Sequence, residues 1–541
     1  MTLYIVRKLL TMPSTKSLAR KNNGSHGYVM PMVLSFVVLA SIFTAALMVL
    51  ISSNTSMVGR NARKQEAFNI AEAGINYYLW HLSHSPTDFK DGKTTPATPD
   101  ATLGYGPYVH NYIDDNSKTT GTYTLWIKPQ GNGSTITTVR SIGKVNGSSV
   151  VRTIEAQLGV PSFASYAVNS DSALWFGNTE RADGPVHSNQ GVRMDGFSST
   201  DVTSANTTYI PPSSLGGDNA SHPGVWCSNT VTTPVNCATR NKSDWRYPVA
   251  SIDFNQVASS LCTMKKLAFG ADSSTSSLAT QATACSQTPT TRTASYIPQR
   301  ATTFSASKGY LIQLNTSGTY DLYNVNAEND QLTPYTSALT LQLVASNIAI
   351  ASNGIIYVED NVWIRSNPTF HGRVTIAAGR LATTNNATVT IADNVKYVAK
   401  DGSDSIGIVA EGDVLIAPYA PPSSGPFTYE IDAAIISQSG NVEYPLTYKT
   451  STSKCTRGWT NSNQNFVYYG SVSVRLDWTW TWLVGSSACG DAASSSGNGY
   501  ITGILNNATQ YDYNLLYAPP PSFPLTSTYN ILSWREVLTI P

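Results

Sequence analysis

The feature that most constrains this chain is an uncharged, mostly apolar segment close to its start, residues 28–51. Its roughly 24 residues would form about 36 Å of helix at 1.5 Å per residue, which is enough to cross a bilayer. A cleaved secretory signal has a shorter apolar region, of about 7–15 residues, followed by a small-residue cleavage site. This segment has neither property and therefore predicts a membrane-spanning helix.

The charges before this segment predict its orientation. Residues 1–27 contain five basic side chains and no acidic one. Because Lys and Arg stay on the cytoplasmic side of a membrane, we expect a cytoplasmic leader (1–27), a single span in contact with lipid, and an exported remainder at the cell surface. The net charge of the whole chain is only +1, which gives a nucleic-acid partner no electrostatic support.

The helix is expected to continue beyond the membrane, to about residue 85. Apolar side chains recur there at three- and four-residue steps, the spacing of one face of an amphipathic helix. The side chains on this face are Phe68, Ala71, Ile75, Tyr78, Leu79 and Leu82. In water such a face needs a partner, so we expect a small β-head to cover it.

These residues resemble type IV pilins and pseudopilins, in particular the large PilX-like minor pilins. The resemblance is carried by a basic leader that ends in Gly27 before the aromatic Tyr28, by the apolar run itself, and by the block AFNIAEAGI (67–75), which contains Glu72. It implies that a prepilin peptidase cuts between Gly27 and Tyr28. It also implies that the long helix packs with other pilin subunits in a filament core.

One position departs from the pilin pattern. Most pilins have Glu at the fifth mature position, where its carboxylate can neutralise the terminal amine of a neighbouring subunit, and here that position is Met32. A subunit at a filament tip, with no neighbour ahead of it, can do without the carboxylate. A single-pass surface adhesin or scaffold outside any filament can do so too, and this alternative stays open.

Beyond the helix the sequence predicts a mainly β protein. Three alternating runs between residues 105 and 160, two of them joined at Asn146-Gly147, predict an antiparallel β-meander as the head. Many short strands of uneven spacing over 161–450 predict a large, right-handed, parallel β-helix-like domain. A β-sandwich is the alternative, because the period is not strict.

Residues 451–541 are expected to form a disulfide-flanked insertion and a C-terminal cap. Three consecutive prolines (519–521) predict a stiff extended stretch without backbone donors. Tyr529 and Trp534 follow it and offer aromatic area for docking. We expect this segment to cover the open end of the β-helix.

All six cysteines lie in the region predicted to be exported, and an even count in an oxidising compartment predicts disulfides. About fifteen pairings are possible, and pairing of neighbours in sequence is the simplest hypothesis. It gives Cys227–Cys237, Cys262–Cys285 and Cys455–Cys489.

Three tryptophans alternate in the run RLDWTWTWLVG, at Trp478, Trp480 and Trp482. On a strand all three would point to one face. That face is either part of the core or an exposed aromatic platform for a surface glycan or protein.

The sequence contains no motif that indicates an enzyme, a cofactor or a metal site. Asp183 and His187 form an acid–histidine combination in a polar turn, for which a structural role is expected. The runs at 401–405 and 327–330 are acidic but lack the spacing of a calcium loop. An exported polysaccharide-active enzyme remains a third alternative, which predicts carboxylates clustered on one face of the β-helix.

Overall fold

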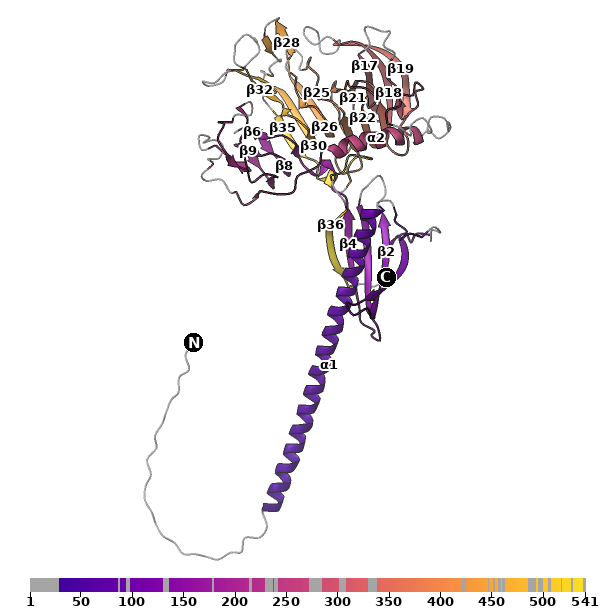
Figure 1. Ribbon diagram of the computed structural model, residues 1–541, viewed down its shortest axis with the longest axis vertical. Coiled ribbons are helices and arrows are strands. Elements are labelled where there is room, and N and C mark those ends of the chain that lie inside the picture. The colour runs from indigo at the N-terminus through magenta and orange to yellow at the C-terminus, as the bar shows by residue number, and fades with distance from the viewer. Residues whose placement is uncertain are drawn as a thin grey trace, which may run out of the picture.

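The computed structural model describes most of residues 29–538. The gaps within this range are 86–87, 94–97, 130–135, 178–179, 214–216, 229–236, 238–241, 272–284, 301–307, 329–337, 421–424, 446, 451–452, 456–458, 460–462, 485–492, 495–499, 505–506, 517 and 527–528. The protein is mainly β, with one long helix at its N-terminal side. Figure 1 shows a bare helical stalk, a small head against the far half of the helix, and a large domain beyond the end of the helix.

The long helix, α1 (Val29–His84), has two halves that differ in burial. Every side chain from Val29 to Gln65 is exposed, whereas buried positions begin at Ala67. In the described part of the chain, α1 is the one helix that is long and apolar enough to cross a membrane, and its apolar window is unburied.

The head is a five-stranded antiparallel sheet in the order β1-β2-β3-β4-β36. Its strands are β1 (Tyr105–Ile113), β2 (Thr119–Pro129), β3 (Ile136–Val145), β4 (Val151–Gly159) and β36 (Asn530–Val537). The three predicted runs correspond to β2, β3 and β4, and the Asn146-Gly147 turn joins β3 to β4. The strand β1 was not predicted. One face of the sheet packs on the buried half of α1 and encloses the core of the head.

The large domain contains three mostly parallel sheets, called sheets I, II and III below. Sheet I holds β5 (Val168–Ser170), β8 (Val186–Ser188), β11 (Val202–Ser204), β15 (Trp245–Arg246), β16 (Tyr296–Ile297), β20 (Ile355–Val358), β22 (Arg373–Ala378), β24 (Ser405–Ala410), β26 (Phe427–Ser437), β30 (Gln464–Val474) and, beside β30, β35 (Asn507–Tyr511). Sheet II holds β17 (Gly309–Asn315), β18 (Thr319–Glu328), β19 (Leu339–Ala349), β21 (Val362–Asn367), β23 (Val389–Ile391), β25 (Val414–Ile416), β27 (Val442–Glu443) and β31 (Trp478–Thr479). Sheet III holds β6 (Leu174–Phe176), β9 (Val192–Met194) and β14 (Val225–Trp226).

The remaining elements are short, apart from the helix α2 (Asn255–Ala271). The short strands are β7 (Arg181–Ala182), β10 (Phe197–Ser198), β12 (Thr208–Tyr209), β13 (His222–Pro223), β28 (Thr447–Thr450), β29 (Ser453–Cys455), β32 (Thr481–Val484), β33 (Ala493–Ser494) and β34 (Tyr500–Gly503). Two 3-10 turns, η1 (Phe163–Ser165) and η5 (Tyr513–Leu516), lie where the large domain meets the head.

Successive strands of the large domain alternate between sheets. From β20 to β27 the chain moves from sheet I to sheet II and back, and each strand pairs in parallel with the next strand of its own sheet. A β-sandwich would instead show antiparallel pairs, so the arrangement is β-helix-like, as expected. The inward side chains of both sheets form one apolar core, in which branched residues such as Ile364, Ile376, Ile391 and Ile408 pack beside aromatic ones. This β-helix-like succession of strands is called the coil below, and its predicted right-handed sense stays a prediction.

The coil is built from two segments that meet in the middle of sheet I. The chain enters at β5, winds outward through β8, β11 and β15, and crosses by α2 to the far edge at β16. It then winds back through β20, β22, β24 and β26 to β30, which pairs with β5 in parallel. The two halves of the coil therefore close on each other.

The expectation for Tyr529 and Trp534 was wrong. They belong to a segment that returns to the head, where β36 pairs with β4, and they do not lie on an end of the coil. The three prolines cross the outer face of sheet I, where Arg373 Nη2 donates to the carbonyls of Ala518 (2.9 Å) and Pro519 (2.7 Å). Proline fits here because its carbonyls accept while its nitrogen needs no partner.

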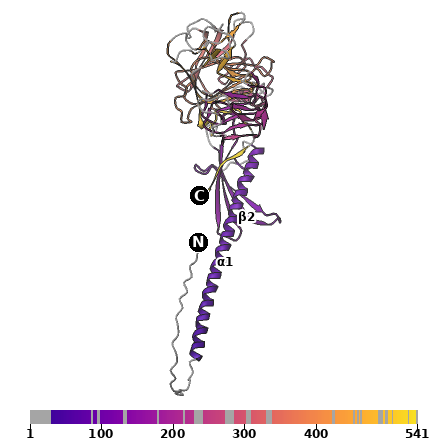
Figure 2. The same ribbon diagram turned by 90° about the vertical axis from the view of Figure 1, so that its left-hand side faces the viewer.

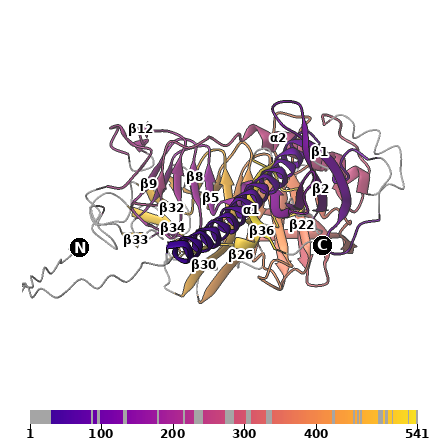
Figure 3. The same ribbon diagram turned by 90° about the horizontal axis from the view of Figure 1, so that it is seen from below.

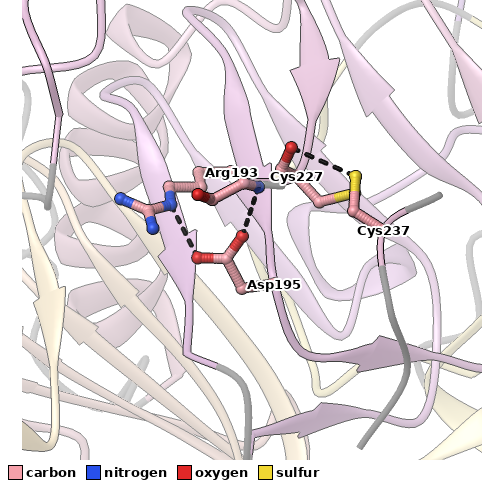
Figure 4. Close-up of a disulfide and its surroundings, with 5 residues drawn as sticks. Arg193, Asp195, Cys227 and Cys237 are labelled. Atoms are coloured by element: carbon pink, nitrogen blue, oxygen red, sulfur yellow. Dashed lines mark hydrogen bonds and ion pairs between the residues drawn. A yellow bond between two sulfur atoms is a disulfide. The ribbon is translucent and has the colours of Figure 1, made fainter. Parts of the chain in front are cut away.

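Two described disulfides match the expected pairing. Cys227–Cys237 has its Cα atoms 5.8 Å apart, and Cys262–Cys285 has them 5.4 Å apart. Figure 4 shows Asp195 beside the first disulfide, accepting from Arg193 Nε (2.6 Å) and from the Ser228 amide (2.8 Å). The predicted Cys455–Cys489 pair lies outside the described residues.

Candidate assembly surface on the long helix

The exposed half of α1 is adapted to an apolar environment. No charged side chain occurs from Val29 to Gly59. Several of its hydroxyl groups bond back to the helix backbone, as Ser35 Oγ does to Pro31 O (2.7 Å) and Thr55 Oγ1 to Ile51 O (2.8 Å). Because these hydroxyl donors are satisfied within the helix, they can face lipid or other helices without being left unpaired.

Met32 lies on this exposed half, in the first turns of the helix, and is 76% exposed. Pro31 precedes it at a position where a proline removes no intrahelical hydrogen bond. Gly27 and Tyr28, the expected processing site, lie outside the described residues.

The buried half of α1 approaches the head sheet closely because small residues face each other. A Cβ on Gly143 of β3 would overlap the backbone of Ala67 and Ala71, and a Cβ on Gly74 would overlap Ser141 and Tyr123. The AFNIAEAGI block thus presents Ala67, Ala71 and Gly74 to the sheet. Its acidic residue, Glu72, points away from the sheet and is exposed.

The predicted amphipathic face is the face that docks on the head. Ala71, Ile75, Tyr78 and Leu82 are buried in the head core. Phe68 and Leu79 are half-buried at its margin. The prediction missed Ala67, Ile70 and Gly74, which are buried on the same face.

Two carboxylates that follow α1 in the chain bind side chains near the C-terminal end of the helix. Asp91 accepts from Tyr77 OH (3.0 Å) and contacts His110 Nε2 on β1 (2.8 Å). Asp88 contacts His81 Nε2 (3.0 Å) and accepts from two backbone amides. These contacts, here called the Asp88/Asp91 clamp, tie α1 to the loop that follows it and to the first strand.

The clamp shifts the pKa of its own groups. Burial, together with the Asp91 carboxylate, raises the pKa of Tyr77 to about 12. At Asp88, burial alone would raise the pKa, but hydrogen bonds from the Lys90 and Gly92 amides and from His81 outweigh it, so the pKa is lowered. Sequence reasoning missed the clamp. The available signal was the Asp-rich turn after the helix, with Asp91-Gly92 as a turn pair.

The three tryptophans do not share one exposed face, so the platform interpretation was wrong. Trp480 is 3% exposed and packs against Phe466, with the ring centroids 5.2 Å apart. Trp478 lies in sheet II and Trp482 in a separate small sheet, where its Nε1 donates to Tyr444 O (2.7 Å). The strand breaks at Trp480, and the core interpretation holds for that residue.

The Asp183–His187 combination does not form. His187 is 1% exposed, and both of its ring nitrogens have partners, Thr203 Oγ1 (2.9 Å) and Asn189 Oδ1 (3.1 Å). Burial lowers the pKa of His187. Asp183 pairs instead with Arg181 at 2.7 Å. Both residues hold turns of the coil together.

One group of carboxylates does lie on the outer face of sheet I. Glu430 and Asp432 both contact Lys400 Nζ, at 2.9 and 2.8 Å, and burial raises the pKa of Asp432 to about 6. A glycosidase needs the gap between its two carboxyl groups for the sugar or water. Here Lys400 occupies that gap, so the group acts as an ion-paired brace.

The two acidic runs considered for calcium use their carboxylates on the chain itself. Asp401 accepts from the Ser403 amide (3.0 Å), and the buried Asp404 accepts from the Gly372 amide (2.8 Å). Glu328 accepts from Trp363 Nε1 (3.1 Å), and the rest of that run is outside the described residues. Within the described ranges, no three His, Cys, Asp or Glu side chains are grouped to hold a metal.

Comparison with known proteins gives one similarity to report. The sequence matches no protein-family model and no curated protein. Among solved structures, the chain is similar to the competence-associated pilin ComZ from Thermus thermophilus, at 12% identity over 88% of this chain and 98% of that chain, with a TM-score of 0.27. A TM-score this far below 0.5 does not establish a shared fold.

Proposed function

We propose that this chain is a non-enzymatic, pilin-like membrane subunit that sits at the tip of a type IV pilus or related filament. There it helps to start assembly or contacts a surface glycan or protein. Its partners are membrane lipid along residues 28–51, a prepilin peptidase, and other pilin subunits.

The position of the large domain is the main observation in support of a location at the filament tip. The domain lies beyond the far end of α1, in line with the helix (Figures 1 and 2). Seen from below, it extends past α1 on both sides (Figure 3). A subunit placed further along a filament of packed helices would need the space that this domain fills. A tip subunit has no such neighbour, which also agrees with Met32 in place of an acidic residue.

In the proposed mechanism, the exposed surface of α1 exchanges its contacts with lipid for contacts with other helices. The uncharged half of α1 stays in the bilayer until contacts with other helices replace its contacts with lipid. The head and its clamp hold the other half rigid, so that the large domain is carried at a fixed position above the filament. This mechanism needs no cofactor.

Mass spectrometry of the N-terminal peptide from purified cell envelope tests the pilin-like route. We expect a mature chain that begins at Tyr28, and we expect Gly27→Leu to leave the leader attached, because the peptidase then lacks its small residue before the cut. Purified filaments should contain the processed chain and lack the Gly27→Leu chain. An intact leader on the unchanged protein, with no chain in filaments, would support the single-pass adhesin or scaffold instead.

A further inference from the structure

The head sheet is completed by a strand that follows the large domain in the chain. β4 ends at Gly159, the large domain comes next, and β36 then returns to pair with β4 from the Asn530–Gly159 pair to the Val537–Thr153 pair. We propose that this returning strand is a latch, which makes the head a finished support for α1 only after the large domain has folded. Its effect on filament entry rests on the proposed function, whereas the latch itself does not.

Side-chain contacts fix the register of the returning strand. Arg535 Nη2 donates to Glu155 Oε1 (2.7 Å), and Arg152 Nη2 donates to Glu536 Oε2 (2.8 Å). A shift of β36 by one residue would turn these side chains to the opposite face of the sheet. The strand therefore fits β4 in one register, as a built-in component of the head would.

The returning strand also contacts the core of the head and α1. Tyr529, just before it, is 8% exposed and belongs to the head core. The ring of Trp534 stands edge-on to Phe68 of α1, with centroids 6.1 Å apart. Phe68 marks the point where α1 leaves the head, so the strand supports the helix at its exit.

The path to β4 depends on a folded large domain. Residues before the strand are held on sheet I by Arg373 and by Thr375, whose Oγ1 donates to Pro521 O (2.5 Å). Two antiparallel segments then form the neck between the domains. In this neck the Phe163 amide donates to Pro524 O (3.0 Å), and the Thr526 amide donates to Pro161 O (2.9 Å).

These contacts order the events of folding. Until β22 and the neck are in place, nothing guides the returning strand to β4. β4 then has an open edge of unpaired backbone groups, and Phe68 lacks its aromatic partner. Subunits with an unfolded large domain would carry an incomplete head and stay out of the filament.

Two shortened chains test the latch. The first ends at Thr528 and lacks the returning strand, and the matched control ends at Leu538 and keeps it. Both are compared with the full chain, purified in detergent, by hydrogen exchange at β4. We expect exchange at the β4 amides to be at least tenfold faster in the chain that ends at Thr528 and unchanged in the control.

A second measurement separates the latch from misfolding and from the filament role. Formation of Cys227–Cys237 and Cys262–Cys285 reports that the large domain has folded, and we expect it in all three chains. In cells, the chain that ends at Thr528 should be at least tenfold depleted in filaments, and the control should not. Unchanged exchange at β4 would overturn the latch, and equal entry of both chains into filaments would overturn its effect on filament entry. Absence of even the full chain from filaments would instead refute the proposed function and leave the exchange result standing.

Discussion

Single residues decide how close α1 comes to the head. Large apolar side chains supply the buried area, but Gly143 and Gly74 determine the distance between helix and sheet. The backbone of α1 nearly touches the sheet at Gly143, and the side chains of Ser141 and Tyr123 lie directly against the helix at Gly74. In a close-packed interior an added methyl group has no free volume to occupy. The smallest side chains are therefore the least replaceable ones in this interface.

Gly143→Val tests this statement. The new side chain would meet the backbone of Ala67 and Ala71, so we expect a loss of about 1–3 kcal/mol in the free energy of unfolding of the head. Gly59→Ala is the matched control, because nothing lies within 4 Å of that site. Thermal unfolding of the full chain in detergent measures both. Equal stability of the two variants would show that the helix can move away from the sheet without loss.

At the scale of elements, charge and hydrogen bonding hold the C-terminal end of α1 in addition to the apolar contacts of Tyr78 and Leu82. The Asp88/Asp91 clamp joins the helix, its following loop and β1 through three contacts between side chains. The folded-state pKa of Asp88 is lowered relative to its usual value of 3.8. Its contribution to stability is therefore complete above about pH 4 and is lost as the pH falls through the lower, folded-state pKa.

Asp88→Asn should reveal that pH dependence. At neutral pH we expect the variant to be less stable by about 1–2 kcal/mol, because hydrogen bonds to a charged acceptor are replaced by weaker ones. Between pH 5 and pH 2 it should lose less stability than the unchanged protein, since the titrating carboxylate is gone. Urea unfolding at several pH values gives both quantities, with Asp115→Asn as the control at an exposed turn. Parallel pH profiles for Asp88→Asn and the unchanged protein would contradict the assignment.

At the scale of the whole molecule, the strand pairing that closes the coil determines how the large domain unfolds. β5 and β30 pair in parallel, and they join the first and last turns of the coil in the middle of sheet I. Val168 lies opposite Val472 at this junction, and both are fully buried. The two halves of the large domain should therefore unfold together.

Val168→Asp tests the expectation that the two halves of the large domain unfold together. A buried, unpaired carboxylate costs several kcal/mol, so we expect a loss of about 3–5 kcal/mol in the free energy of unfolding. Hydrogen exchange should then accelerate both at β8 and at β26. Val398→Asp, at a half-exposed site, should change neither. Loss of protection at β8 alone would show that the halves are independent.

The sequence predicted the helix, its buried face, the antiparallel head and the alternating strands, because each of them produces a local pattern of apolar residues. The period of apolar residues follows from which side of one element meets the core. It failed where a contact joins distant residues. Trp480 is buried by Phe466, and β36 pairs with a strand that precedes the whole large domain. No local period encodes either partner.

By itself, then, the sequence determined a helix that suits lipid along one half, cysteines that pair with their neighbours in sequence, and a mainly β remainder. These are properties of charge, hydropathy and spacing along the chain. The tertiary structure alone decided that the coil closes at β5 and β30, that Trp480 lies in the core, and that the returning strand completes the head. Those outcomes depend on packing between residues far apart in sequence, where shape and hydrogen-bond partners become defined only in three dimensions.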